Sequence, residues 1–112
     1  MRYEVRVLQP AVQFLETLDV KMKAKAYRAI SLLQEFGPFL TEPHSKKITG
    51  IKNLYELRVK QASNICRLFY FHSNGKVYIV TSGYIKKSNK TSRSELEKAE
   101  RIMNQFKEEN HE

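Results

Sequence analysis

Apolar and polar side chains alternate along residues 2–8, where Tyr3, Val5 and Val7 fall on one side of the chain. A period of two residues is typical of a strand that is buried on one face only. Pro10 follows this stretch and is well placed in the first turn of a helix, because it needs no backbone N–H partner there. The chain is therefore expected to begin with a strand that leads directly into a helix.

Apolar residues then recur at steps of three and four, the spacing that places them on one face of a helix. They are Ala11, Leu15, Leu18, Met22, Ala26, Ala29, Leu33 and Phe36. Asp19 can cap a helix, so we expect a short helix to about Leu18 and a second from about Val20 to Phe36, with one bent helix as the alternative. Gly37 and Pro38 are stop signals, and residues 39–53 read as a loop.

Strand patterns return in the middle of the chain. Residues 55–60 alternate between apolar and polar, whereas residues 65–71 are apolar on both faces apart from Arg67. A polar turn separates these two stretches, and Asn74-Gly75 predicts a hairpin into a further strand over residues 77–84. The three strands are expected to form an antiparallel meander.

A last helix is predicted after residue 92. Ser92 and Glu95 match a capping box, in which the hydroxyl accepts the Glu95 N–H and the carboxylate accepts the Ser92 N–H. The apolar stripe of this helix is Leu96, Ala99, Met103 and Phe106. The order β-α-α-β-β-β-α predicts a single α+β domain over residues 1–112, with an antiparallel sheet, an N-terminal helical hairpin and a C-terminal helix. We expect the helices on one face of the sheet and the other face, or its rim, free to bind.

The charge distribution suggests what that free face binds. The 112 residues hold 20 Lys and Arg against 12 Asp and Glu, a net charge of +8, and residues 41–93 alone carry +9. Such a surplus favours a polyanion as partner, either nucleic acid or a very acidic protein. Cys66 is the one cysteine, which excludes an internal disulfide and a cysteine-based zinc cage. No apolar run has the length of a membrane span, and the first ten residues lack the apolar block of a secretory signal. We therefore expect a cytoplasmic protein without cofactor or metal.

Two arginines on neighbouring strands are the first candidates for function. If Tyr55, Leu57 and Val59 face the helices, then Glu56, Arg58 and Lys60 face outward, and Arg67 joins them or lies beneath them. A guanidinium among apolar neighbours, as at Arg67, needs a partner or a ligand, whereas Arg58 has the simpler alternative of an exposed ion pair with Glu56 or Glu4. The lysines expected around them are Lys46, Lys47, Lys60, Lys86, Lys87 and Lys90.

Other candidate groups have simpler structural explanations. Tyr84 can stack on a nucleic-acid base, although aromatic residues at strand spacing are more often part of a core. Cys66 is best interpreted as a small buried apolar residue, and the three histidines as surface residues. No HExxH, GxSxG or phosphate-binding glycine loop occurs in the sequence.

Three motifs together resemble a known family. They are IKNLYELR at Ile51–Arg58, CRLFY at Cys66–Tyr70 and GYIKKSNKT at Gly83–Thr91, followed by an acidic amphipathic helix. The three motifs occur in this order after an N-terminal strand and a helical hairpin. In this arrangement the chain resembles, over almost its whole length, the HigB branch of the RelE/ParE-type bacterial toxins. The resemblance implies a toxin of a type II toxin–antitoxin system that enters the ribosomal decoding site and cleaves messenger RNA.

The same resemblance implies partners and roles. A cognate HigA-like antitoxin with a helix-turn-helix domain would form a hetero-oligomer with the toxin. The toxin would contact DNA only indirectly, through this antitoxin, and no membrane partner is expected. Arg58, Arg67 and Lys86 or Lys87 match the catalytic basic residues of the related ribonucleases. RelE-type enzymes carry a second basic residue where this chain has Glu56, and their C-terminal catalytic tyrosine has no counterpart after Tyr84.

The residues themselves suit this chemistry. When an RNA 2′-hydroxyl attacks its own phosphate, Arg58 and Arg67 can stabilise the negative charge, and Lys86 or Lys87 can protonate the departing 5′-oxygen. Glu56 is the nearby carboxylate, more simply explained as an ion-pair partner of Arg58. ParE relatives share the fold but poison DNA gyrase, so a gyrase inhibitor is the alternative, and a non-catalytic RNA-binding module is the third.

Overall fold

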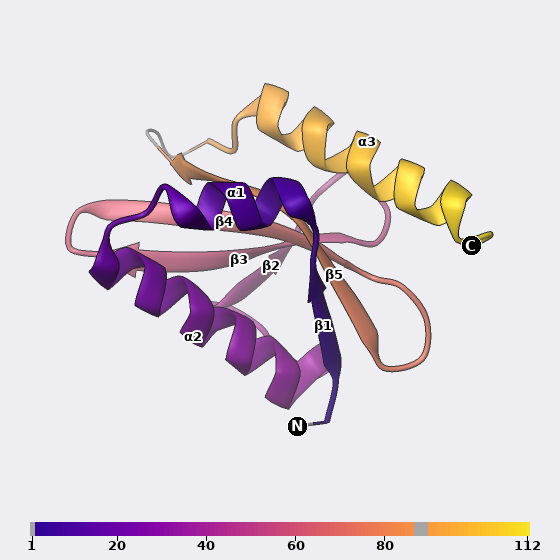
Figure 1. Cartoon of the computed structure of the whole chain (residues 1–112), viewed down its shortest axis with the longest axis horizontal. Coiled ribbons are helices and arrows are strands. Elements are labelled where there is room, and N and C mark those ends of the chain that lie inside the picture. The colour runs from indigo at the N-terminus through magenta and orange to yellow at the C-terminus, as the bar shows by residue number, and fades with distance from the viewer. Residues whose placement is uncertain (1, 87–89) are drawn as a thin grey trace.

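The order of elements along the chain follows the predicted one. A computed structural model describes residues 2–86 and 90–112 (Figure 1). In chain order the elements are β1 (Glu4–Val7), α1 (Gln9–Glu16), α2 (Val20–Phe36), the short 3-10 helix η1 (Gly37–Phe39), β2 (Ser45–Lys47), β3 (Leu54–Gln61), β4 (Asn64–His72), β5 (Val77–Lys86) and α3 (Arg93–Glu109). The N-terminal helical region is two helices, and not one bent helix.

The strands form one sheet in the order β1-β5-β4-β3-β2. The three-stranded meander β3-β4-β5 is antiparallel as predicted, and β2 extends it in the same sense. β1 joins the edge of β5 in parallel, since the chain between them makes a long crossover. The N-terminal strand therefore closes one edge of the sheet and the short strand β2 the other.

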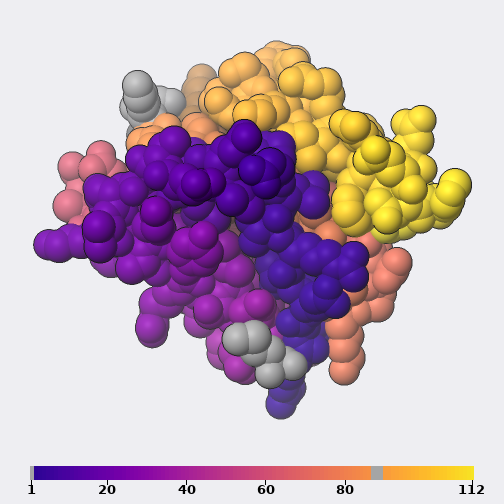
Figure 2. Space-filling model, in the orientation of Figure 1, coloured from indigo at the N-terminus to yellow at the C-terminus, as the bar shows by residue number. Residues whose placement is uncertain are grey.

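Helices cover both faces of the sheet, and the expectation of a single covered face was wrong. α1 and α2 pack on one face, where Leu57 and Leu68 join their core. α3 packs on the other, where Phe69 and Phe71 join Met103. Because β4 is apolar on both sides, each side must be removed from water. In the space-filling view the N-terminal segment and α2 form most of the near surface, with α3 along its upper rim (Figure 2).

Local signals explain where the helices and turns begin and end. Asp19 caps α2 as predicted, its carboxylate accepting the Met22 N–H at 2.8 Å. Gly37 ends α2 with φ of 49°, and a Cβ there would lie 2.6 Å from the ring of Tyr3. At the β4–β5 turn only Gly75 takes a positive φ, and residues 73–76 form the connection.

One strand was missed by the sequence analysis. β2 lies inside the stretch predicted as a loop and pairs with Tyr55–Leu57 of β3. Three residues, two of them lysine, are too few to produce a readable alternation. Among the helices of the described part of the chain, none is long and apolar enough to cross a membrane.

Candidate nucleic-acid interface

Four basic side chains gather at one end of the α3 face of the sheet, and we call them the cation cluster: Lys46, Arg58, Arg67 and Lys86. The strand register brings them together. Arg58 lies opposite Arg67, and paired residues of antiparallel strands place their side chains on the same face. Lys46 lies opposite Glu56, which shares a face with Arg58, and Lys86 lies two residues beyond the partner of Arg67 on β5.

Electrostatic effects on Lys86 reflect this arrangement. The pKa of Lys86 is lowered, first by burial and then by the positive charges of Arg67 and Arg58, with a smaller contribution from Lys46. The Glu56 carboxylate acts in the opposite direction and raises the pKa. A lysine with a lowered pKa gives up its proton more readily near neutral pH, which is what a general acid requires.

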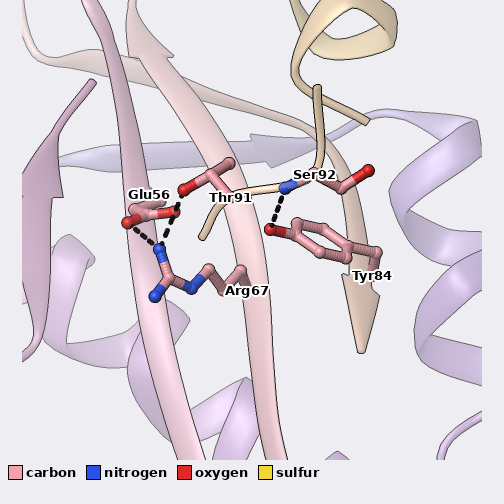
Figure 3. A network of polar contacts seen from close by, with 5 residues as sticks. All are labelled: Glu56, Arg67, Tyr84, Thr91 and Ser92. Atoms are coloured by element: carbon pink, nitrogen blue, oxygen red, sulfur yellow. Dashed lines mark hydrogen bonds and ion pairs between the residues drawn. The ribbon is translucent and has the colours of Figure 1, made fainter. Parts of the chain in front are cut away.

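Arg67 is buried in an internal ion pair. Its side chain is 4% exposed, that of Glu56 is 1% exposed, and Arg67 Nη1 donates to Glu56 Oε1 (Figure 3). The same nitrogen donates to Thr91 Oγ1 at 3.2 Å. Glu56 Oε2 and Arg67 Nε have no partner among the described residues. The guanidinium thus finds the partner that its apolar surroundings require.

Glu56 does not face outward as predicted. The segment before α3 lies over this end of β3 and β4, where Thr91 contacts Arg67, and a carboxylate beside a buried guanidinium is retained as its counter-charge. The ion pair expected between Glu56 and Arg58 is instead formed with Arg67. Thr91 was not a candidate in the sequence, since a single threonine in a polar segment carries no periodic signal.

Tyr84 connects β5 to the start of α3. Its ring stacks on Phe69, with centroids 5.8 Å apart and an interplanar angle of 15°, and its hydroxyl accepts the Ser92 N–H at 3.0 Å (Figure 3). The predicted capping box is therefore half formed. Ser92 Oγ accepts the Glu95 N–H at 3.4 Å, but the Ser92 N–H bonds to Tyr84 and not to the Glu95 carboxylate. One face of the Tyr84 ring is occupied by this packing.

The remaining predicted cations differ in their placement. Arg58 and Lys86 are half-buried, whereas Lys46, Lys60 and Lys90 are exposed. Lys46, Arg58 and Lys86 are therefore the members of the cation cluster that a phosphate can reach without displacing the buried Glu56–Arg67 ion pair.

Among the described residues, the predicted lysine Lys47 does not join the cluster. Lys47 lines a separate groove with Lys52 and Lys107 of α3. Lys87 lies outside the described residues.

Other candidate groups lie away from the cluster. Cys66 is fully buried between the sheet and the first two helices, and burial raises the pKa of its thiol to about 12, which agrees with the prediction of a small apolar residue. His72 Nε2 lies 2.7 Å from the Gly75 carbonyl oxygen at the hairpin. No three His, Cys, Asp or Glu side chains in the described ranges gather closely enough to hold a metal ion.

Comparison with known proteins places the chain in a family. Residues 13–104 match the family model described as "Phage derived protein Gp49-like (DUF891)". The chain belongs to the Gp49-like family. No curated protein matches this Gp49-like chain.

Solved structures share the fold of the Gp49-like chain. The isolated Escherichia coli RelE toxin is 21% identical, with a TM-score of 0.58 over 89% of this chain and 98% of RelE. The RelE–RelB complex from the archaeon Pyrococcus horikoshii matches at 21% identity and a TM-score of 0.56, over 74% of this chain and 93% of the other. The intact Escherichia coli RelBE toxin–antitoxin complex matches at 19% identity and 0.58, over 79% and 99%. The α+β fold predicted from the sequence is thus the fold of RelE.

Proposed function

We propose that this protein is the toxin of a type II toxin–antitoxin pair and that it cleaves messenger RNA on the ribosome, as a HigB-like member of the RelE superfamily. The observation that carries the proposal is the cation cluster, where Arg58 and Lys86 lie half-buried on one face and Arg67 lies directly beside Arg58. A family of proteins with the RelE fold, two of them solved as toxin–antitoxin complexes, supports the assignment.

Arg58 has the properties of a phosphate ligand. A guanidinium offers a planar pair of donors to two phosphoryl oxygens and stays charged at every relevant pH. The 2′-hydroxyl loses its proton to water as its oxygen attacks the adjacent phosphorus. A bond forms between them, the bond to the 5′-oxygen breaks, and extra negative charge develops on the phosphoryl oxygens. Arg58 would stabilise that charge.

Lys86 has the properties of the general acid. The proton that the 5′-oxygen takes up as it leaves must come from a nearby donor, and Lys86 carries one with a lowered pKa. Lys46 is exposed on the neighbouring edge and adds positive potential along the path of the RNA backbone. Lys60, Lys90 and Tyr84 are proposed to contribute to RNA binding in the same region.

Arg67 is assigned a different role from the catalytic role that the sequence predicted. Because it is paired with Glu56 and nearly inaccessible, we assign it as a positioning residue that sets the local charge beside Arg58 and Lys86. Glu56 in turn limits the repulsion among these cations, as its effect on the pKa of Lys86 indicates. The arginine that touches RNA in this proposal is Arg58.

An antitoxin is the expected partner. A small protein with a net charge of +8 attracts an acidic segment by the same field that attracts RNA. We propose a HigA-like antitoxin with a helix-turn-helix domain, which would bring the complex to DNA.

Primer extension on total RNA after brief induction tests the proposal. We expect new 5′ ends within translated messages for the wild-type protein, and their loss for Arg58→Ala at equal protein level and equal melting temperature. A wild-type protein that leaves mRNA intact while trapping gyrase on DNA would replace the nuclease with a gyrase inhibitor. RNA binding without cleavage or growth arrest would leave only the non-catalytic module.

A further inference from the structure

A cavity of about 340 Å³ lies at the end of the sheet opposite the cation cluster, where β3 and β5 begin and β4 ends. We call it the tyrosine pocket, because four of the six tyrosines of the chain line it: Tyr3, Tyr55, Tyr70 and Tyr78. Tyr55 lies three residues before Arg58 on β3, and therefore on the other face of the sheet, in the core with α1 and α2. The pocket is thus separate from the proposed cleavage site.

The aromatic walls of the pocket are held by their own contacts. Tyr55 stacks on Tyr70, with centroids 5.3 Å apart and an interplanar angle of 19°. Tyr78 meets both Tyr3 and Tyr70 edge to face, with centroids 6.0 Å apart in each pair. The Tyr70 hydroxyl lies 2.5 Å from Ser45 Oγ in a buried hydrogen bond. Because Tyr3 and Tyr55 are only half-buried, part of this preformed aromatic surface stays open to a planar ligand.

Polar atoms beside the rings can recognise the edge of such a ligand. The Asn53 side-chain N–H donates to the His72 carbonyl oxygen at 2.8 Å, which leaves Asn53 Oδ1 as an acceptor. Of the four tyrosine hydroxyls, only that of Tyr70 has a hydrogen-bond partner among the described residues. Nucleobases carry donors and acceptors around a planar ring, so they can use both the rings and the polar atoms of the pocket.

The charge around the pocket narrows the class of ligand. None of the described residues that line it is acidic. The separate groove of Lys47 adjoins it, since Asn53, Tyr55 and His72 line both, and that groove has three lysines and one glutamate. Lys47 lies opposite Tyr55 in the strand register and so shares its face of the sheet. Aromatic pockets also bind quaternary ammonium ions, but these lysines repel a cation and favour a planar ligand with negative charge.

We propose that the tyrosine pocket binds one nucleotide, with its base against the rings of Tyr3 and Tyr55 and its phosphate at Lys47 and Lys52. Small-molecule sites have volumes of about 300–1,000 Å³, so this cavity suits one nucleotide and not a run of several. A free mononucleotide and a single nucleotide of a longer RNA share this chemistry. Since the pocket lies on the other face of the sheet from the cation cluster, its binding does not depend on the proposed cleavage.

Isothermal titration calorimetry on the whole protein tests recognition of the base. The ligands are adenosine 5′-monophosphate, uridine 5′-monophosphate and ribose 5-phosphate, which has no base. We expect at least one of the nucleotides to bind about tenfold or more tightly than ribose 5-phosphate, and Tyr55→Leu to weaken that nucleotide about tenfold. Tyr27→Leu, at an exposed tyrosine of α2 outside the pocket, should bind it as the wild type does. Absence of nucleotide binding, or equal binding by the two tyrosine variants, would overturn the proposal.

A surface variant tests the phosphate position and leaves the rings in place. Lys47→Ala/Lys52→Ala should weaken the nucleotide about fivefold and its nucleoside less than about twofold. The matched variant Lys98→Ala/Arg101→Ala, which removes two exposed cations of α3, should weaken neither by more than about twofold. Equal losses of the nucleotide in the two double variants would refute the assignment of its phosphate to this groove.

Competition with labelled oligoadenylate and oligouridylate distinguishes the two sources of the nucleotide. If the pocket holds one nucleotide of an RNA, the mononucleotide should displace the oligonucleotide, and Tyr55→Leu should bind the oligonucleotide more weakly. Oligonucleotide binding that neither change affects would identify a free mononucleotide as the ligand. None of these measurements needs cleavage, so a protein that binds the nucleotide but cuts no mRNA would refute the nuclease and leave the pocket assignment standing.

Discussion

The face of the sheet that carries α3 has two halves built on the same strands. In the apolar half, Phe69, Phe71 and Ile79 pack against Ala99 and Met103 of α3. In the charged half, the cation cluster and Glu56 occupy the ends of β3 and β4 and the end of β5. The apolar stripe of α3 matches the first half only, so the helix leaves the second half to the short segment before it and to solvent. The candidate site lies where helical cover stops.

Within the charged half, two facing arginines have different surroundings. Arg67 is nearly inaccessible and paired with Glu56, whereas Arg58 on the neighbouring strand is half-buried. Neighbouring positions in one sheet thus separate a structural cation from one that can meet a ligand. The difference comes from Thr91 and Glu56, which enclose Arg67 and not Arg58.

Removing the internal counter-charge should have the largest effect on stability. Glu56→Ala leaves the Arg67 guanidinium buried without its carboxylate, and we expect the free energy of unfolding to fall by about 3–5 kcal/mol in urea denaturation. Glu4→Ala is the matched control, since its pair with Arg6 at 2.5 Å is 55% exposed on both sides and should contribute no more than about 1 kcal/mol. Similar losses in the two variants would mean that burial does not make the Glu56–Arg67 ion pair more important for stability than an exposed pair.

Removing the link between the halves should have an intermediate effect. Tyr84→Phe keeps the stacking on Phe69 but leaves the Ser92 N–H without its acceptor, which should cost about 0.5–1.5 kcal/mol and speed amide exchange at Ser92. Tyr27→Phe, at a residue that is 48% exposed, serves as the control. Unchanged exchange at Ser92 would show that Tyr84 does not hold the start of α3.

The smallest expected effect is a shift in the pH dependence of the cleavage rate. As the acid, Lys86 must be protonated, so the rate should fall as pH rises through its lowered pKa, below the 10.5 of an ordinary lysine. Lys46→Ala removes a neighbouring positive charge, raises the pKa of Lys86 and should move this alkaline fall slightly to higher pH. Persistence of the same alkaline fall in Lys86→Met would assign it to another group.

Much of the fold was readable because its signals are local or periodic. Asp19, Gly37 and the stripe from Ala11 to Phe36 defined the helices, and alternation with short turns defined the meander that brings Arg58 opposite Arg67. These features depend on neighbours a few residues apart, which a single sequence contains.

The expectations that were wrong concern contacts between segments that lie far apart in the sequence. The sequence of β4 is apolar on both faces, which indicates that each face of the sheet is covered by helices. The expectation of a single covered face did not take this pattern into account. Glu56 is buried beside Arg67, and the other side-chain partner of Arg67 is Thr91, which lies 35 positions after Glu56 in the chain.

Single-turnover cleavage of mRNA on programmed ribosomes tests the central claim most directly. Arg58→Ala/Lys86→Ala removes the two half-buried members of the cation cluster, and Lys76→Ala/Lys98→Ala removes the same charge from exposed positions on the β4–β5 turn and on α3. We predict a loss of at least about 100-fold for the first pair and less than about threefold for the second. Equal losses in the two double variants would contradict the account, since they would show that total charge and not the charged half of the sheet face governs cleavage.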